Sequence, residues 1–409
     1  MTARHQLVLI TLAICATIFL APSSLDSVPH RQGGLIASGE INRIYIPPPE
    51  SVRPGLARRT ANIVVNYNPG SCPSGVTTAW SSEAQAAFEY AVSIWAAILN
   101  SDLTIEIDAC WRNDMASNVL GSAGPARYFQ DFTDAPQAST WYAVALANEY
   151  NGSDLNGGTA EINANFNSSF GWYFGTDGNP SNFQYDFVST VLHEIAHGLG
   201  FAGSMNFDDG VSPNECGGSA GTGCYGAGTV DPFIYDQFTE NDAGTSLIAY
   251  TNPSTGLGNQ ITSNDVFFDG TSANILNGGT RVELYAPSLW NPGSSYSHLG
   301  QNFNGTDNAL MTFSADFGEA IHHPGIVALG LLIDIGWDIR NLATVWVDVT
   351  YSGEEIGGPT NPFNTVAEGT KAVEPNGTVL IRPGTYDEEL TIIRAMLIRP
   401  EGGDAVIGQ

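Results

Sequence analysis

The sequence predicts an α+β protein with a small all-β segment at its C-terminal end. Helical and strand patterns alternate up to about residue 340, and after that only short β-rich runs follow, separated by glycine and proline. Of the 409 residues, 43% are hydrophobic, which is enough for a sizeable core. We therefore expect a large mixed domain over residues 61–340 and a smaller domain over residues 341–409.

The chain begins with the features of a secretion signal. Arg4 and His5 precede an apolar run from Leu7 to Ala21, which is short for a membrane span and typical of a signal-peptide core. We expect a signal peptide over residues 1–24. Because no later run is long and apolar enough to span a bilayer, we expect the mature protein to be secreted.

The charge balance excludes some classes of partner. The chain has 14 Lys and Arg against 42 Asp and Glu, which gives a formal charge of -28. Such a chain repels nucleic acid and anionic membranes, so we expect neither as a partner. The sequence leaves the oligomeric state open.

A pro-segment or linker is predicted for residues 25–60, which lack apolar periodicity and include the dibasic stretch ARRT at residues 57–60. From residue 61 the pattern becomes strand, helix, strand. NIVVNY and LTIEIDACW are the strands, and Ser81 or Ser82 can cap the helix between them. The apolar positions of this helix share one face: Phe88, Ala91, Ile94, Trp95 and Ile98.

The stretch TAEINANF, residues 159–166, alternates apolar and polar side chains. This period of two predicts a half-exposed strand with Glu161, Asn163 and Asn165 on its polar face. We expect it to be an edge strand that binds an extended peptide by strand addition. A helix is predicted next, from about Asp186 to Leu199.

That helix carries the sequence HEIAH. His193 and His197 lie four residues apart and share a face, with Glu194 about 100° away around the axis. Two neutral imidazoles and a third protein ligand leave zinc one position for water, and an adjacent carboxylate can take the proton of that water. We expect zinc at the two histidines and Glu194 as general base. A hydrogen-bonded structural pair of histidines is the alternative.

The third ligand must come from elsewhere in the chain. Gly200 is predicted to end the helix and turn the chain under the metal. Gly203 stands where the commonest form of the motif has a third histidine. The remaining candidates are His298, His322, His323, Asp208 and Asp209.

The order of these parts resembles the leishmanolysin-like branch of the metzincin zinc metalloproteases. In that branch HExxHxLGF is followed by an insertion, then SH, then LM, and here HEIAHGLGF, SHL and ALM stand in this order. The resemblance covers roughly residues 61–340 and implies a twisted mixed sheet, His298 as the third ligand and Met311 as the structural Met-turn residue. Two positions depart from it: LG follows His298 instead of an aromatic and an acidic residue, and Phe313 replaces the tyrosine of some metzincins.

Four cysteines follow the signal peptide, and in an exported protein they predict two disulfides. Three pairings are open, and we favour Cys216 with Cys224 and Cys72 with Cys110. No CxxC spacing supports a zinc knuckle. DLNGG at residues 154–158 and NFDDG at residues 206–210 have a calcium-like composition, so Ca²⁺ is a second candidate ion.

The second half of the chain is less regular. Residues 204–290 are predicted to be a long insertion of loops and short strands, and a helix follows from about Pro324 to Gly336. Residues 341–409 resemble the opening coils of a right-handed parallel β-helix, which needs stacked coils to bury its core.

These features predict a secreted zinc endopeptidase acting on protein or peptide substrates, with the cleavage preference left open. One alternative is a catalytically silent adhesion or binding protein, for which loss of Glu194 or of a ligand would be the sign. Another is a polysaccharide-active enzyme with its chemistry in residues 341–409, where no acidic cluster on one strand face is evident.

Overall fold

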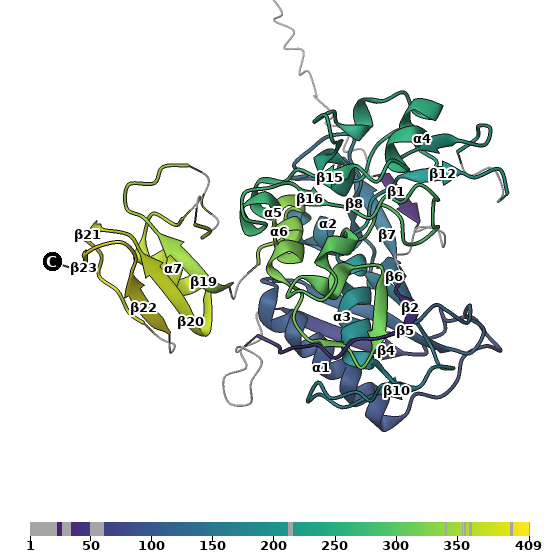
Figure 1. Ribbon diagram of the computed structural model, residues 1–409, viewed down its shortest axis with the longest axis horizontal. Helices are drawn as coiled ribbons and strands as arrows, with labels where there is room; N and C mark the ends of the chain where they lie inside the picture. The colour runs from purple at the N-terminus through teal and green to yellow at the C-terminus, as the bar shows by residue number, and fades with distance from the viewer. Residues whose placement is uncertain are drawn as a thin grey trace, which may run out of the picture.

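The computed structural model shows a mixed α/β protein (Figure 1). The predicted signal peptide over residues 1–24 lies outside the described residues except for its last two. The described residues are 23–26, 34–49, 61–211, 216–339, 342–353, 355, 357–359, 362–392 and 396–408.

A four-stranded mixed sheet lies at the centre of the large domain. Its strand order is β4 (Asn62–Tyr67), β5 (Thr104–Arg112), β9 (Ile162–Asn167) and β6 (Gly121–Pro125). The first three strands are parallel, and β6 pairs with β9 antiparallel. A helix joins β4 to β5, as a parallel connection requires. β6 is therefore an edge strand of this sheet.

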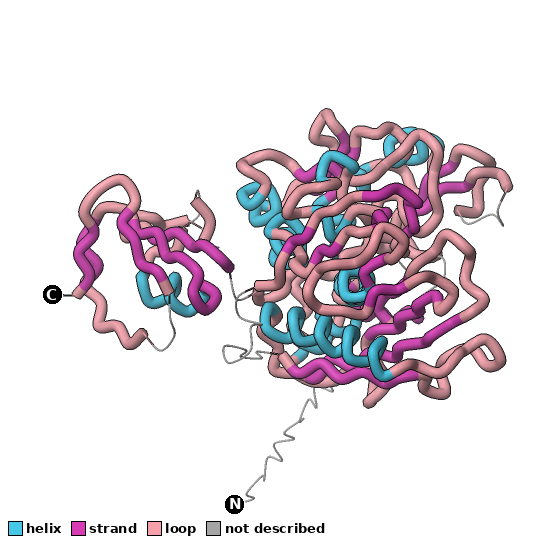
Figure 2. Tube along the Cα trace, turned by 60° about the horizontal axis from the view of Figure 1, so that its bottom comes forward, coloured by secondary structure: helices cyan, strands magenta, loops and turns pink. Residues whose placement is uncertain are grey.

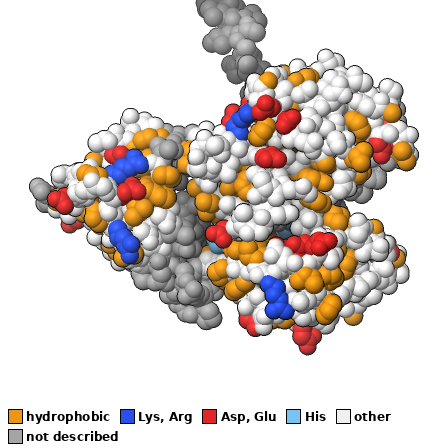
Figure 3. All heavy atoms as spheres, in the orientation of Figure 1, with side chains coloured by type: hydrophobic (Ala, Val, Ile, Leu, Met, Phe, Trp, Pro, Cys, Tyr) orange, Lys and Arg blue, Asp and Glu red, His pale blue; other side chains and the backbone are white. Residues whose placement is uncertain are grey.

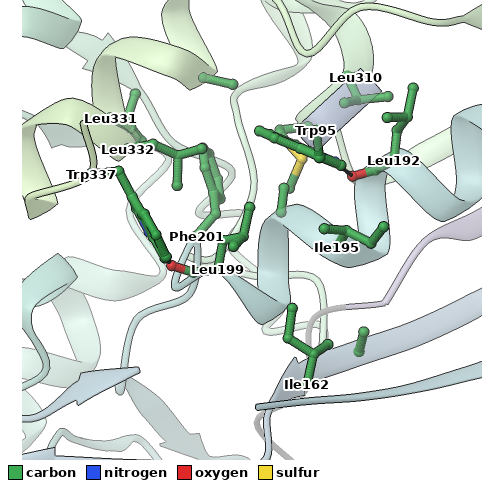
Figure 4. Packing of buried hydrophobic residues seen from close by; sticks show 14 of the residues in the cluster. Trp95, Ile162, Leu192, Ile195, Leu199, Phe201, Leu310, Leu331, Leu332 and Trp337 are labelled. Carbon is green, nitrogen blue, oxygen red and sulfur yellow. Dashed lines mark hydrogen bonds between the residues drawn. The ribbon is translucent and has the colours of Figure 1, made fainter. Parts of the chain in front are cut away.

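Two helices pack together against the sheet. α1 (Ser82–Ile98) begins where Ser81 accepts a hydrogen bond from the Ala84 amide, and α3 (Phe187–Gly198) follows the sheet's strand β9. Trp95 of α1 donates its indole N–H to the Leu192 carbonyl of α3 at 3.1 Å. Figure 4 shows Leu192, Ile195 and Trp95 packed in this core. The packing fixes α3, which carries the HEIAH sequence.

The region predicted as an insertion has more structure than we expected. It contains helices α4 (Thr255–Ile261) and α5 (Thr271–Leu276), whose apolar residues are too few to show a helical period in the sequence. Figure 2 shows short strands and helices joined by long loops in this part of the molecule. The other elements are β12 (Asn206–Asp208), β13 (Thr222–Cys224), β14 (Thr239–Asn241), β15 (Val266–Phe268), β16 (Val282–Glu283) and the 3-10 helices η3 (Ile234–Phe238) and η4 (Leu247–Ala249).

The predicted helix after the insertion is present as α6 (Ile326–Ile335), and it ends at Gly336, whose φ is 122°. Trp337 then donates to the Leu199 carbonyl at 2.8 Å and ties this helix to the end of α3 (Figure 4). The remaining elements of the large domain are short: β1 (Ser23–Asp26), β7 (Arg127–Gln130), β8 (Tyr142–Ala143), α2 (Val144–Asn151), β10 (Trp172–Tyr173), β11 (Tyr185–Asp186), η5 (Gln301–Phe303) and η6 (Ala309–Met311).

Part of the predicted pro-segment or linker is packed on the large domain. β2 (Ile36–Ile41) pairs in parallel with β17 (Ser314–Phe317), and β3 (Tyr45–Ile46) pairs in parallel with β18 (Ala320–Ile321). Leu35 belongs to the main core. These residues were not predicted as strands because their apolar side chains show no alternation.

The C-terminal residues have a hydrophobic core of their own, which includes Val345, Val379 and Ile381. The strands are parallel, as stacked coils would be, and a short helix precedes β20. The β-helix itself stays a prediction. The elements are β19 (Leu342–Val347), α7 (Val366–Ala372), β20 (Val373–Ile381), β21 (Gly384–Tyr386), β22 (Leu397–Pro400) and β23 (Ala405–Ile407), in the sheets β19-β20-β22 and β21-β23.

Both favoured disulfides are formed, Cys72 with Cys110 and Cys216 with Cys224. Among the described residues, no helix has the length and apolarity needed to cross a membrane. The face drawn in Figure 3 carries more acidic than basic side chains, in line with the composition.

Because the C-terminal core is separate, its stability can be changed selectively. Ile381 is 1% exposed, so Ile381→Ala leaves a cavity and should destabilise this part by about 2–5 kcal/mol. Ile392→Ala is the matched control, because Ile392 is 48% exposed. Hydrogen exchange should show faster exchange in β20 and unchanged exchange in α3. Equal loss of protection in both would mean that the two cores unfold as one unit.

Candidate metal centre

α3 places His193 and His197 on one face and ends directly after them. Asp186 caps the helix by accepting a hydrogen bond from the Ser189 amide at 2.7 Å. At the other end Gly200 has a φ of 106°, in the left-handed region that favours glycine. Gly200 N–H donates to the His197 carbonyl at 3.1 Å, so the chain turns back just beyond the second histidine.

His298 completes a cluster with these two histidines. The three Nε2 atoms lie 3.0 Å apart for His193 and His197, and 3.2 Å apart for each of the two pairs with His298. All three side chains are fully buried. Among the described residues, this is the one group of three or more His, Cys, Asp or Glu side chains that can hold a metal ion.

The second nitrogen of each ring fixes its protonation. Nδ1 of His193, His197 and His298 lies 2.7 Å from the backbone carbonyl of Leu310, Phe201 and Ser294, respectively. A carbonyl oxygen can only accept, so each Nδ1 donates its hydrogen. In a neutral ring the Nε2 then carries a lone pair, and three lone pairs point toward a common centre.

This donor set fits a tetrahedral zinc ion. With Zn–N bonds of about 2.0–2.1 Å, tetrahedral geometry places the nitrogens roughly 3.3 Å apart, close to the observed separations. Burial lowers the pKa of His193 and His298 well below the usual value and lowers the pKa of His197 to about 4. Neutral rings at pH 7 are the form that binds metal.

The short helix that contains Met311 links two of the histidines. The Met311 side chain is fully buried in η6. The preceding residue, Leu310, supplies the carbonyl that holds His193, and the Met311 carbonyl accepts from the Leu299 amide at 2.8 Å, next to His298. The turn at Met311 therefore sets the spacing between the helix and the His298 segment.

Glu194 lies on the side of α3 that faces β6. It is fully buried, and its Oε1 accepts a hydrogen bond from the Leu35 amide at 3.1 Å. Its Oε2 has no hydrogen-bond partner among the described residues. Burial raises the pKa of Glu194 well above its usual value, against the effect of the Leu35 hydrogen bond. A raised pKa makes the carboxylate a stronger proton acceptor.

Gly203 is required by packing against the His298 segment. A Cβ at this position would overlap the ring of Tyr296 and would lie 2.7 Å from Asp236 Oδ1. Asp236 is buried, accepts hydrogen bonds from the Ser204 amide and the Tyr296 hydroxyl at 2.9 Å each, and so joins the turn after α3 to the residues before His298. Sequence reasoning missed Asp236 because nothing distinguishes it among the acidic residues of the insertion.

The predicted substrate edge is wrong. β9, which contains Asn163 and Asn165, pairs with β5 on one side and β6 on the other, so it is an interior strand. Glu161 is buried, and its Oε2 accepts from the Glu106 amide at 2.7 Å. The alternation reflected one polar face of an interior strand. The edge strands of this sheet are β4 and β6, and β6 is the one that contacts α3.

The other ligand candidates lie outside the cluster. His322 is buried and its Nε2 lies 3.0 Å from Asp186 Oδ1, at the start of α3. His323 accepts from the Gly325 amide at 2.9 Å. Asp208 and Asp209 accept hydrogen bonds from nearby backbone amides. The calcium sites stay a prediction.

Comparisons with known proteins give a partial match. The family model described as SPBPB7E8-like matches residues 69–215, less than half of the chain. This stretch includes His193, Glu194 and His197 but ends before His298 and Met311. No curated protein and no solved structure matches the chain. These comparisons therefore assign no chemistry to the histidine cluster.

The contact at Gly203 leads to a prediction. Gly203→Ala should destabilise the protein by about 1–3 kcal/mol and weaken zinc binding, because the methyl group displaces Tyr296 and with it His298. Gly70→Ala is the control, since no heavy atom lies within 4 Å of a Cβ built there. Denaturant unfolding and elemental analysis measure the two effects. Equal stability and zinc content in both variants would contradict this role of Gly203.

Proposed function

We propose that this protein is a zinc-dependent endopeptidase. The observation that carries the proposal is the convergence of three buried Nε2 atoms, each ring oriented by a backbone carbonyl, beside the buried carboxylate of Glu194. His193, His197 and His298 would hold the ion. Bound zinc supplies a Lewis acid that lowers the pKa of water and polarises a carbonyl group.

The residues of the chain have separate parts in this reaction. The three histidines would hold the ion, and the turn at Met311 keeps their spacing. Glu194 lies one residue from His193 on the same helix, so its carboxylate can take a proton from the attacking water and deliver it to the leaving amine. Burial excludes bulk water and strengthens these electrostatic interactions.

The leishmanolysin-like resemblance is part of the proposal. A mixed sheet with an antiparallel edge strand beside α3, a third histidine that follows a long insertion, and a buried methionine next to the Leu310 carbonyl that holds His193 all support it. Two disulfides support a secreted protein, because they persist in oxidising compartments. The silent binding protein is less favoured, because Glu194 and all three histidines are retained.

The ligand assignment predicts zinc contents. His298→Ala should reduce bound zinc as much as His197→Ala does, because each removes one of three ligands. His323→Ala is the control: its Nδ1 contacts the Gly325 amide and is not part of the cluster. Elemental analysis of the purified variants measures this. Full zinc in His298→Ala, or none in the unchanged chain, would overturn the metal site.

The proton transfer predicts the behaviour of Glu194→Gln. The glutamine amide has nearly the same shape as the glutamate carboxylate but is not a base. Peptide hydrolysis should therefore fall by about 10²–10⁴-fold while zinc stays bound. The measurement is cleavage of a casein-like substrate together with zinc content, before and after chelation. Unchanged hydrolysis in this variant would exclude Glu194 as the base.

A further inference from the structure

Residues 34–46, which we call the strap, lie against the candidate site. They include β2 and β3, and the Leu35 amide contacts Glu194 of α3. The strap lies between two walls. One wall is residues 118–120, which lead into the edge strand β6, and the other is residues 313–322, which follow Met311.

On the first side the strap pairs with the residues directly before β6. The Ala37 amide donates to the Asn118 carbonyl at 2.8 Å, and the Leu120 amide donates to the Leu35 carbonyl at 2.9 Å. Ile36 and Val119 form an antiparallel bridge. This short antiparallel pairing beside an edge strand uses the same backbone hydrogen bonds as strand addition, the way in which many proteins bind extended peptides.

Backbone hydrogen bonds also hold the strap on the second side, where the pairing is parallel. Both walls therefore contact the main chain of the strap. The bonds on the second side are Ile36 N–H to Phe313 O at 3.0 Å, Asn42 N–H to Phe317 O at 3.0 Å, Ala320 N–H to Ile44 O at 2.9 Å and His322 N–H to Ile46 O at 2.8 Å. Three strap side chains add contacts: Ser38 Oγ donates to Asp316, Arg43 Nε donates to Asn182 Oδ1 at 2.7 Å, and the Tyr45 ring packs edge-on against His322.

Among the side chains of the strap, Leu35 is the one that is buried. Leu35 is 3% exposed and belongs to the main core, whereas Ile41 is 56% exposed. The Leu35 amide is also the group that donates to Glu194 Oε1. Gly121 lies on the other side of Glu194, where a Cβ would come within 3.0 Å of its carboxylate. The strap backbone therefore occupies the space that water or substrate needs next to Glu194.

We infer that the strap occupies the substrate groove as a built-in competitor, and that the groove binds extended peptides with an aliphatic side chain at the position of Leu35. This inference rests on the proposed function. Because the bonds to the two walls are made by the strap backbone, an unrelated peptide in an extended conformation can make the same hydrogen bonds. The enzyme is then latent while the strap is bound and active when the strap leaves.

The latency does not use a metal ligand from the strap. The sequence has no cysteine between Cys15 and Cys72, and residues 34–46 contain no histidine or aspartate. Their one acidic residue, Glu40, is exposed and is not part of the histidine cluster. The contact is to the carboxylate of Glu194 through a main-chain amide. Release therefore exposes Glu194 and leaves the three histidines unchanged.

The test compares two variants of the full chain. Leu35→Asp places a charge at a buried position and should release the strap, whereas Ile41→Asp makes the same change at an exposed position and should not. Hydrogen exchange reports release independently of activity: the amides of Leu120, Ala320 and His322 should exchange at least tenfold faster in Leu35→Asp. Exchange in α3 and zinc content should match the unchanged chain.

With the strap released, kcat/KM for an added peptide should rise at least tenfold, and Glu194→Gln in the same background should abolish the gain. A synthetic peptide of residues 34–46 should inhibit Leu35→Asp competitively. If the amides of α3 exchange faster in Leu35→Asp than in the unchanged chain, the same measurements are made on Leu35→Ala instead.

The outcomes separate the two proposals. Suppose that Leu35→Asp releases the strap, keeps its zinc and hydrolyses peptides no faster than an unchanged chain that is already active. This result would overturn the inference that the strap competes with substrate. So would a strap peptide that fails to inhibit. Protected wall amides in Leu35→Asp overturn Leu35 as the anchor. Absence of hydrolysis in every form, with the strap released and zinc bound, overturns the proposed endopeptidase function.

Discussion

Three hydrogen bonds from histidine Nδ1 atoms to backbone carbonyls determine the rest of the site. The accepting carbonyls belong to Leu310, Phe201 and Ser294, which lie in three different parts of the chain. Each bond selects one tautomer, so the opposite nitrogens present lone pairs to the same point. Because the acceptors are main-chain atoms, the backbone path sets the orientation of the rings. The turn at Gly200 and the turn at Met311 are therefore constraints on the ligands as much as on the fold.

The insertion between α3 and His298 is part of this arrangement. Closing a long loop costs entropy that grows only slowly with its length, so a distant ligand is tolerable if its segment is held in place. Asp236 does this by accepting hydrogen bonds from the Ser204 amide and the Tyr296 hydroxyl. Burial raises the pKa of Asp236, and these hydrogen bonds oppose the effect. Because Gly203 has no side chain, the Tyr296 ring can pack against the turn. A histidine at position 203 would overlap this ring, and Tyr296 lies in the same segment as His298.

The sequence predicted the parts that depend on local patterns. α1, α3 and α6 have helical spacing and recognisable ends, and His193, Glu194 and His197 lie within one helix, where spacing fixes geometry. His298 and Met311 could be proposed only from the order of motifs. Asp236 and Leu35 act through contacts with residues far away in the chain, and no local pattern marks such contacts. The wrong prediction for β9 has the same cause. Alternation identifies a strand with one polar face, but whether one or two other strands pair with it depends on the fold of the whole chain.

The edge strand β6 was not predicted because its sequence, GSAGP, has small residues, glycine and proline, which are weak strand formers. The structure gives a reason for this composition. Gly121 lies so close to Glu194 that a Cβ would press on the carboxylate, and Gly34 of the strap passes with a Cβ position 3.3 Å from the Gly121 carbonyl. Larger residues would push the strand and any peptide beside it away from α3. Two backbones can approach one carboxylate this closely only where the residues are small. Small residues weaken the strand pattern, so the composition that would let a peptide bind beside β6 also prevents β6 from being recognised in the sequence.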